Sequence, residues 1–316
     1  MNALPILLAL LSFSVTGECQ EENFKFKNLG IKNRTVTSKE WLKYKKDPSN
    51  WKPKVDYVYH KSTKPQDQSA GISYDVGISM QITGGMRARQ KMFPWQILLL
   101  ATEGWLCGGS LISSEWVMTA AHCVDGASSV VIYAGGIDQK NKQEKNEQRY
   151  SSATLIKHEN YDANLTQNDI ALVKVLFTLD KFVNLIRLPK YSDATNAFDN
   201  KKVLLAGYGQ TADVGASSRY MMYNFMKTIT NTECALLYAP EYVTSSIICT
   251  GPDKKKSACY GDSGGALNVQ EKDKKYTAIG IVSSGPDLCI NFISTYTRVT
   301  SFLGWISEKT GIQILA

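Results

Sequence analysis

The chain of 316 residues carries 36 basic and 29 acidic side chains, for a formal net charge of +7, and it contains seven cysteines. Its 43% of hydrophobic residues can build a packed core, which excludes a wholly disordered chain. No cysteine or histidine spacing fits a structural zinc site, and the sequence predicts neither a metal nor a cofactor.

The chain begins with an apolar run, MNALPILLALLSFSV, which is too short for a membrane span of about 17 to 25 residues. Val15 and Gly17 lie at the spacing that a signal peptidase reads, so the sequence predicts a signal peptide over 1–17. Cleavage after Cys19 is the alternative. No later window is apolar enough to span a membrane, and we expect a secreted, extracellular protein with no membrane contact.

Residues 18–81 are polar and basic, with twelve basic and seven acidic side chains within 20–81. This composition is typical of a poorly ordered extension, here a basic propeptide. Basic and aromatic residues interleave in KEWLKYKKDPSNWKPKVDYVYHKSTKP, a pattern that also suits contact with a polyanion such as nucleic acid or a sulfated glycan. Asn33, and Asn164 further along, begin Asn-X-Thr triplets and are predicted glycosylation sites.

From Ile82 onward, short apolar or alternating runs recur between connectors that contain Gly, Asn or Asp. They include WQILLLAT, WVMTAAH, VVIYAGG, DIALVKV, KVLLAGYG and YTAIGIVSS. Their spacing is typical of an all-β barrel or sandwich. The end, TSFLGWISEKTGI, has apolar residues at helical spacing after Thr300 or Ser301. It predicts one C-terminal helix with either residue as its N-cap.

Three short segments carry the residue types of a nucleophilic site: TAAHC around His122, NDIALVKV around Asp169 and GDSGG around Ser263. A serine hydroxyl attacks once a base takes its proton, and an imidazole is that base when a carboxylate holds its tautomer. Glycines beside the serine let the backbone present N–H groups to a developing oxyanion. Each segment alone suits a turn or a cap, but together they favour catalysis.

On these motifs, residues 82–316 resemble the chymotrypsin-like serine proteases over essentially their whole length. The resemblance implies an all-β fold of two antiparallel six-stranded β-barrels, with the site between them and a C-terminal helix. It implies that His122 is the general base and acid, Asp169 its orienting carboxylate and Ser263 the nucleophile of an acyl-enzyme. The N–H groups of Gly261 and Ser263 would form the oxyanion hole. The implied disulfides are Cys107–Cys123, Cys234–Cys249 and Cys259–Cys289, which leaves Cys19 without a partner.

The segment QITGG at 81–85 resembles the activation site of this family, where one cut releases an Ile-Val-Gly-Gly-like terminus. The resemblance implies that the new ammonium of Ile82 forms a buried ion pair with Asp262, the residue before the nucleophile. Gln81 departs from the family, in which Arg or Lys is usual. No basic residue lies between Lys64 and Ile82, so we expect an activating protease that is not trypsin-like.

Ser257 lies six residues before the nucleophile, where trypsin-like members carry an Asp that pairs with a substrate Lys or Arg. We expect Ser257, Gly285 and Ser294 to line the substrate pocket. A neutral pocket favours apolar or aromatic side chains and then small aliphatic ones, as in chymotrypsin- or elastase-like members. Asp287 is the nearby charge that would instead support a basic preference.

Two more departures concern a surface loop and the substrate cleft. Calcium-binding relatives carry carboxylates at both ends of the loop that corresponds to 137–147. Here Glu144 and Glu147 stand at one end and Ile137 at the other, so no calcium site is expected. Ser284 stands where Trp is common in the family, which changes the contact with the substrate strand.

The sequence therefore predicts a secreted serine endopeptidase that is made as a zymogen and acts on protein or peptide substrates. One alternative is a non-catalytic homologue that acts as a binding protein or cofactor, and the intact His122, Asp169 and Ser263 argue against it. The other is a polyanion- or matrix-binding protein that works through residues 25–64.

Overall fold

The structure is a computed structural model that describes residues 84–316, apart from 142–143, 212–215, 239, 254–255, 286–288 and 290–291. The predicted signal peptide, the basic propeptide, Asn33, Gln81, Ile82 and Asp287 lie outside the described residues. Among the described helices, none is both long enough and apolar enough to cross a membrane.

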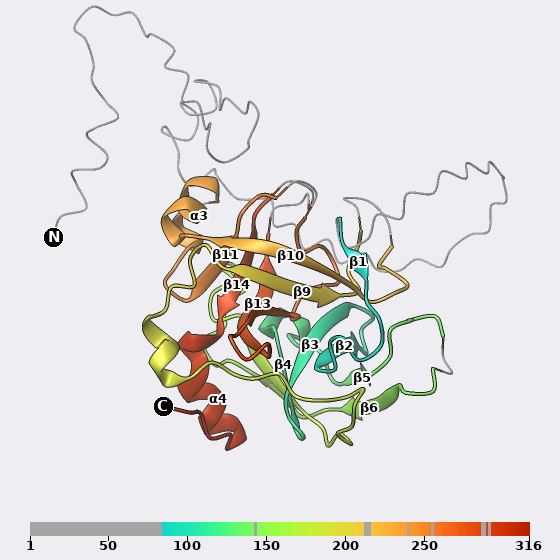
Figure 1. The fold of residues 1–316 in the computed structure, drawn as a ribbon. Helices are drawn as coiled ribbons and strands as arrows, with labels where there is room; N and C mark the ends of the chain where they lie inside the picture. Colours follow the sequence, from blue (N-terminus) through green and yellow to red (C-terminus); the bar gives the residue numbers. More distant parts are fainter. Residues whose placement is uncertain are drawn as a thin grey trace, which may run out of the picture. The chain divides into compact units, whose positions relative to one another are not determined.

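The first half of the described chain forms an antiparallel sheet of seven strands in the order β6-β5-β2-β3-β4-β8-β7 (Figure 1). Its strands are β2 (Gln96–Ala101), β3 (Leu106–Ser113), β4 (Trp116–Thr119), β5 (Val130–Ala134), β6 (Gln148–Ser152), β7 (Leu155–Lys157) and β8 (Ala171–Lys174). β6 and β7 form the two edges, yet only residues 153–154 separate them in the chain. The chain therefore passes from one edge to the other and closes this sheet into a barrel.

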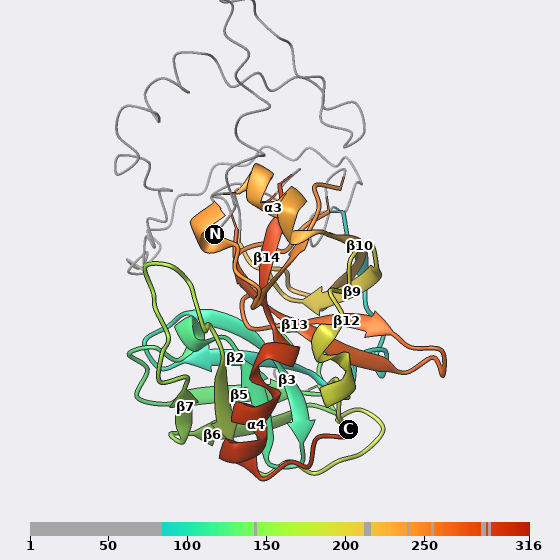
Figure 2. The same ribbon diagram turned by 90° about the vertical axis from the view of Figure 1, so that its left-hand side faces the viewer.

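The second half forms another seven-stranded antiparallel sheet, in the order β1-β10-β11-β14-β13-β12-β9. Its strands are β1 (Met86–Arg87), β9 (Lys202–Gly207), β10 (Met222–Ile229), β11 (Ile247–Thr250), β12 (Ala266–Gln270), β13 (Tyr276–Ser284) and β14 (Ser294–Arg298). Because β9 pairs with both β10 and β12, six of these strands close into a barrel, and the two-residue β1 lies outside it on β10. Figure 2 shows the two groups of strands, the first coloured from blue-green to yellow-green and the second from gold to red apart from the cyan β1. The predicted all-β fold of two barrels is confirmed.

The predicted apolar runs become the buried strands. β5 alternates as expected for a strand with one face in the core, and Val130, Ile132 and Ala134 point inward. β2, which lies between β3 and β5 in the middle of its sheet, is buried on both faces. Each fully buried Leu or Ile side chain contributes roughly 1.5 to 3 kcal/mol of transfer free energy. The cores of the barrels thus follow from these runs.

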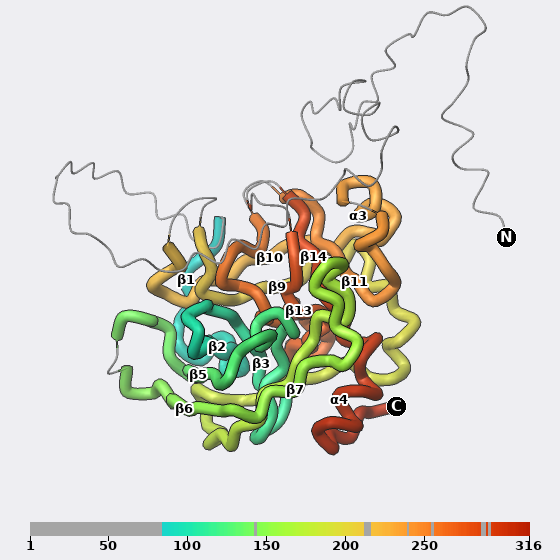
Figure 3. The backbone as a smooth tube through the Cα atoms, turned by 180° about the vertical axis from the view of Figure 1, so that it is seen from behind, coloured from blue at the N-terminus to red at the C-terminus, as the bar shows by residue number. Residues whose placement is uncertain are grey.

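The predicted C-terminal helix is α4 (Leu303–Thr310), which begins after the expected N-caps. Residues Val299–Phe302 first form a 3-10 turn, so Phe302 and not Thr300 or Ser301 precedes the helix, and no side chain caps it. The predicted N-cap was therefore wrong. α4 follows the second barrel in sequence but packs on the first, because His158, just after β7, contacts the rings of Phe302 and Trp305 (Figure 3).

Three disulfides join elements of the described chain: Cys107–Cys123, Cys234–Cys249 and Cys259–Cys289. This is the pairing that the resemblance implies. They close loops with sequence separations of 16, 15 and 30 residues. Loops of this length give each bridge about 3 kcal/mol of stabilisation in the chain-entropy account. The second bridge ties α3 (Asn231–Leu237) to β11.

Candidate active site

His122 and Asp169 meet because the strands next to them are paired. His122 lies in the 3-10 turn η2 (Ala121–Cys123) shortly after β4, and Asp169 lies just before β8. The register of β4 and β8 places Thr119 opposite Ala171. Nδ1 of His122 is 2.8 Å from Oδ2 of Asp169, and the backbone N–H of His122 donates to Oδ1 at 3.0 Å. Both oxygens of one carboxylate thus orient one histidine.

The second barrel also holds Asp169. The hydroxyl of Ser283, on β13, donates to Oδ2 of Asp169 at 2.6 Å. The hydroxyl of Thr297, on β14, donates to the backbone carbonyl of Asp169 at 2.8 Å. Sequence reasoning missed both residues, because a Ser or Thr in a buried strand carries no local sign of a partner more than 100 residues away. Asp169 itself is only 1% exposed.

Burial and charge act in opposite directions on this pair. Burial alone lowers the pKa of His122, but the Asp169 carboxylate outweighs it and the pKa of His122 is raised above its ordinary value. Burial alone raises the pKa of Asp169, but His122 and the Ser283 hydroxyl outweigh it, and the pKa is lowered. Asp169 is therefore ionised at neutral pH. Since a carboxylate only accepts hydrogen bonds, Nδ1 carries a proton, and Nε2 has a lone pair whenever the imidazole is neutral.

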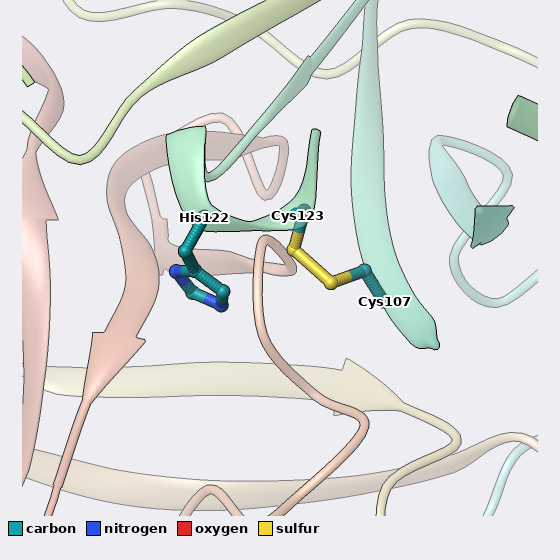
Figure 4. Close-up of side chains that lie close together, drawn as sticks. All are labelled: Cys107, His122 and Cys123. Atoms are coloured by element: carbon teal, nitrogen blue, oxygen red, sulfur yellow. A yellow bond between two sulfur atoms is a disulfide. The ribbon is translucent and has the colours of Figure 1, made fainter. Parts of the chain in front are cut away.

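Figure 4 shows how the turn that carries His122 is tied to β3 by the Cys107–Cys123 disulfide. The side chains of Cys107, His122 and Cys123 place their ligand atoms within 4.8 Å of one another. Both sulfurs are bonded to each other, so neither is a thiolate that could bind a metal ion. The disulfide therefore fixes the turn that carries His122 to β3.

The loop around Ser263 is pressed against the first barrel beside His122. The backbone N–H of Gly108 donates to the carbonyl of Ser263 at 2.6 Å. Gly264 has φ +80°, and a Cβ there would lie 2.1 Å from Oγ1 of Thr119 and 2.5 Å from the carbonyl of Gly108. Only glycine allows this approach. The glycine after the serine therefore brings Ser263 to the end of β4, three residues before His122.

The backbone around Ser263 leaves two donors available. Gly261 adopts φ +95°, which an L side chain rarely tolerates. Within the described part of the chain, the N–H groups of Gly261 and Ser263 donate to no protein acceptor. Two such donors, two residues apart on a tight turn, suit an anionic oxygen.

Asp262 is a second buried carboxylate, 1% exposed. Its Oδ1 accepts from the N–H of Gly209 at 2.8 Å, and its Oδ2 accepts from the N–H of Cys259 at 3.1 Å. A Cβ on Gly207 would lie 2.2 Å from Oδ1, so glycines make room for this carboxylate. Burial raises the pKa of Asp262 to about 7, although the two N–H donors act to lower it. No Lys, Arg or His of the described ranges forms an ion pair with it.

The predicted pocket residues Ser257 and Ser294 are brought together around Cys289. The hydroxyl of Ser257 donates to the carbonyl of Cys289, and the hydroxyl of Ser294 accepts from the N–H of Ala258 at 3.2 Å. Both serines are buried, while Gly285 is exposed at the end of β13. Hydrogen bonds with the backbone thus hold both hydroxyls in place.

In the loop at 137–147, hydrogen bonds within the protein hold the carboxylate of Glu144. Its Oε2 accepts from the N–H groups of Ile137 and Asp138 at 2.9 and 3.0 Å, and its Oε1 accepts from the side chain of Gln90 at 2.8 Å. Burial and the neighbouring Glu144 raise the pKa of Glu147. Elsewhere, the side chain of Asn164 is exposed.

The chain is similar to named proteases over most of its length. The sequence model of the Trypsin family matches residues 82–306. A collagenase of Hypoderma lineatum is 34% identical over 73% of this chain and 88% of its own, and a chymotrypsin of Phaedon cochleariae is 32% identical over 75% and 84%. A brachyurin of Leptuca pugilator is 33% identical over 73% and 99%. A solved structure of HL collagenase, 33% identical, covers 73% of this chain and 99% of its own with a TM-score of 0.66.

A serine protease of the chymotrypsin fold is the class that these barrels and similarities define. The chain belongs to the trypsin family and is a serine endopeptidase.

The raised pKa of Asp262 predicts a pH-dependent stability of the uncut chain. A folded-state pKa of about 7 against the ordinary 3.8 means that this group costs no stability below pH 3.8. Stability then falls as the pH rises through 7, by about 4 kcal/mol in total. Urea unfolding between pH 4 and 8 measures it, with Asp262→Asn as the control that lacks this slope. Identical pH slopes for the two chains would contradict the prediction.

Proposed function

We propose that His122, Asp169 and Ser263 form the catalytic triad of this endopeptidase. His122 Nε2 takes the proton of the Ser263 hydroxyl while Oγ bonds to the carbonyl carbon of the scissile peptide. The imidazolium then gives this proton to the leaving amine, and the C–N bond breaks to leave an acyl-enzyme. Water, deprotonated in turn by His122, then bonds to the acyl carbon. The bond from this carbon to Oγ breaks, His122 returns the proton to Oγ of Ser263, and the acid product leaves. The observation that carries the proposal is the buried carboxylate of Asp169 on Nδ1 of His122 at 2.8 Å.

Electrostatics support these roles. Asp169 keeps its charge in the interior because its pKa is lowered, and that charge stabilises the imidazolium of His122. The N–H groups of Gly261 and Ser263 accommodate the tetrahedral oxyanion, at about 10²- to 10³-fold in rate for a donor. A buried carboxylate that orients one histidine, close in the fold to the loop of Ser263, is an arrangement that a binding protein without catalysis does not need. We therefore favour the catalytic function over the non-catalytic alternative.

We further propose that the chain is a zymogen activated by a cut between Gln81 and Ile82. Asp262 supports this assignment, because a buried carboxylate with two neutral donors and no described cation is incomplete at neutral pH. The ammonium of Ile82 would supply the missing charge. Asp262 adjoins Gly261 and Ser263, so this ion pair would hold both donors of the oxyanion hole in place.

For substrates, we propose protein or peptide chains with an apolar or aromatic side chain before the scissile bond. The neutral serines at 257 and 294 support this preference, since neither supplies a charge for Lys or Arg. The names of the relatives, collagenase and chymotrypsin among them, make collagen a substrate worth testing.

We propose that the protein is secreted as a glycoprotein. The apolar run at 1–17, the three disulfides and the exposed Asn164 support export to an oxidising compartment. Contact of the basic residues within 18–81 with a polyanion remains a proposal from composition alone.

Activation by trypsin is predicted to fail in the natural chain and to succeed in the variant Gln81→Arg. Trypsin cuts after Lys or Arg, and Gln81 offers neither, whereas cuts at Arg87 or Arg89 would discard Ile82. N-terminal sequencing and peptide hydrolysis after trypsin treatment measure the outcome. An active natural chain that begins at Ile82 would disprove the prediction.

A fluorophosphonate probe is predicted to label Ser263 alone in the activated Gln81→Arg chain. His122 is the base that we assign to Ser263, so the same chain with Ser263→Ala should lose the label and at least about 10⁴-fold of kcat. Peptide mapping of the labelled protein and steady-state hydrolysis provide the readouts. A well-folded activated chain that takes no label would establish the non-catalytic alternative.

Peptide substrates are predicted to reveal a neutral pocket. With Phe or Leu before the scissile bond, kcat/KM should exceed that for Arg by at least about tenfold, because no described charge meets a guanidinium. The variant Ser257→Asp should reverse the order by placing a carboxylate in the pocket. A natural enzyme that prefers Arg would contradict this and would point to Asp287.

A further inference from the structure

The second barrel carries a basic cavity that is not lined by His122, Asp169 or Ser263. It measures about 430 Å³ and lies over β9 and β10 and the loop before Ser257. Three lysines line it, with one acidic residue; the lining is Asn200, Lys202, Phe225, Met226, Lys227, Asp253 and Lys256. β9 runs from Lys202, at the cavity, to Gly207, which lies beside Asp262. These two residues are roughly 17 Å apart along the strand.

Two of these lysines face each other across paired strands. Lys202 on β9 and Lys227 on β10 are direct partners in the antiparallel register (Figure 1). Directly opposed residues point to the same face of a sheet, and like charges in that position are destabilising. Both side chains are exposed, and neither forms an ion pair with a described carboxylate. An anion between them would turn this repulsion into attraction.

Phe225 and Lys256 complete the cavity. The ammonium of Lys202 lies 4.2 Å from the centroid of the Phe225 ring, and that of Lys256 lies 3.5 Å from the carbonyl of Phe225. Asp253 is the acidic residue of the lining, and it contacts Lys256 at 3.6 Å, near the limit for an ion pair. Three lysines therefore line one hollow and outnumber its single acidic residue.

These features select the chemistry of the ligand. Several ammonium donors around a hollow suit sulfate or phosphate groups, whose oxygens accept from many directions. Nucleic acid would also need a free aromatic face on which bases stack, and Lys202 already covers the ring of Phe225. The three disulfides indicate an oxidising compartment, in which sulfated glycans are the abundant polyanions.

We propose that the cavity at Lys202, Lys227 and Lys256 is a binding site for a sulfated polysaccharide. Such a chain would hold the protease on a matrix while the active site, at the other end of β9, stays open to substrate. The site is separate from the basic segment 18–81 and would persist after that segment is cut away.

The test measures the binding of low-molecular-weight heparin to the full uncut chain with Ser263→Ala, by calorimetry between 50 and 200 mM NaCl. Lys202→Gln with Lys227→Gln is expected to weaken binding about tenfold at 100 mM and to reduce the slope of log K against log salt by about two. The chain with Lys202→Arg and Lys227→Arg keeps both charges, so it should bind with the affinity and the salt slope of the chain that carries the natural lysines. Segment 18–81 is intact in every chain, so differences between them report on the cavity.

The matched control is Lys174→Gln with Lys181→Gln. These lysines also lie over aromatic rings, Trp116 and Phe182, but on the first half of the chain. We expect less than a twofold change from this pair. An equal loss in both pairs would show a diffuse charge effect, and no loss in either would assign binding to 18–81. If a thymidine 20-mer binds as tightly as heparin and its binding also depends on Lys202 and Lys227, then the cavity binds polyanions in general and is not a site for a sulfated glycan. Each of these results overturns the proposal.

Discussion

The buried carboxylate of Asp169 is the constraint on which the site depends. A charge in the interior is costly unless donors surround it, and here the donors come from both barrels. His122 follows β4 of the first barrel, whereas Ser283 belongs to β13 of the second. The arrangement around Asp169, with donors from both barrels, therefore forms only when both are folded and in contact.

Asp262 is also a buried carboxylate, but its pKa is shifted in the opposite direction from that of Asp169. Both carboxylates are 1% exposed, yet the pKa of Asp169 is lowered and that of Asp262 is raised. The difference is the histidine beside Asp169, whereas Asp262 has two neutral N–H donors. Among the described residues, Asp169 has a histidine beside its carboxylate, whereas no cation forms an ion pair with Asp262. This difference is the physical basis of the activation that we propose.

Much of this could be predicted from residue patterns. The apolar runs locate the strands because a half-buried strand requires alternation and a central one requires continuous apolar residues. The helix at the C-terminus was found but not its start, because a 3-10 turn over Val299–Phe302 has no distinct pattern. Ser283 and Thr297 were missed, since nothing near them in the chain reveals a partner.

By itself, the sequence determined which chemical groups the protein has, their order and the strands that carry them. It identified His122, Asp169 and Ser263 through local motifs, and the glycines through the turns they permit. Only the tertiary structure decided that Ser283 reaches Asp169 from 114 residues away and that Lys202 opposes Lys227. Such contacts depend on strand register and barrel closure, which arise from packing summed over the whole chain and leave no mark on any short segment.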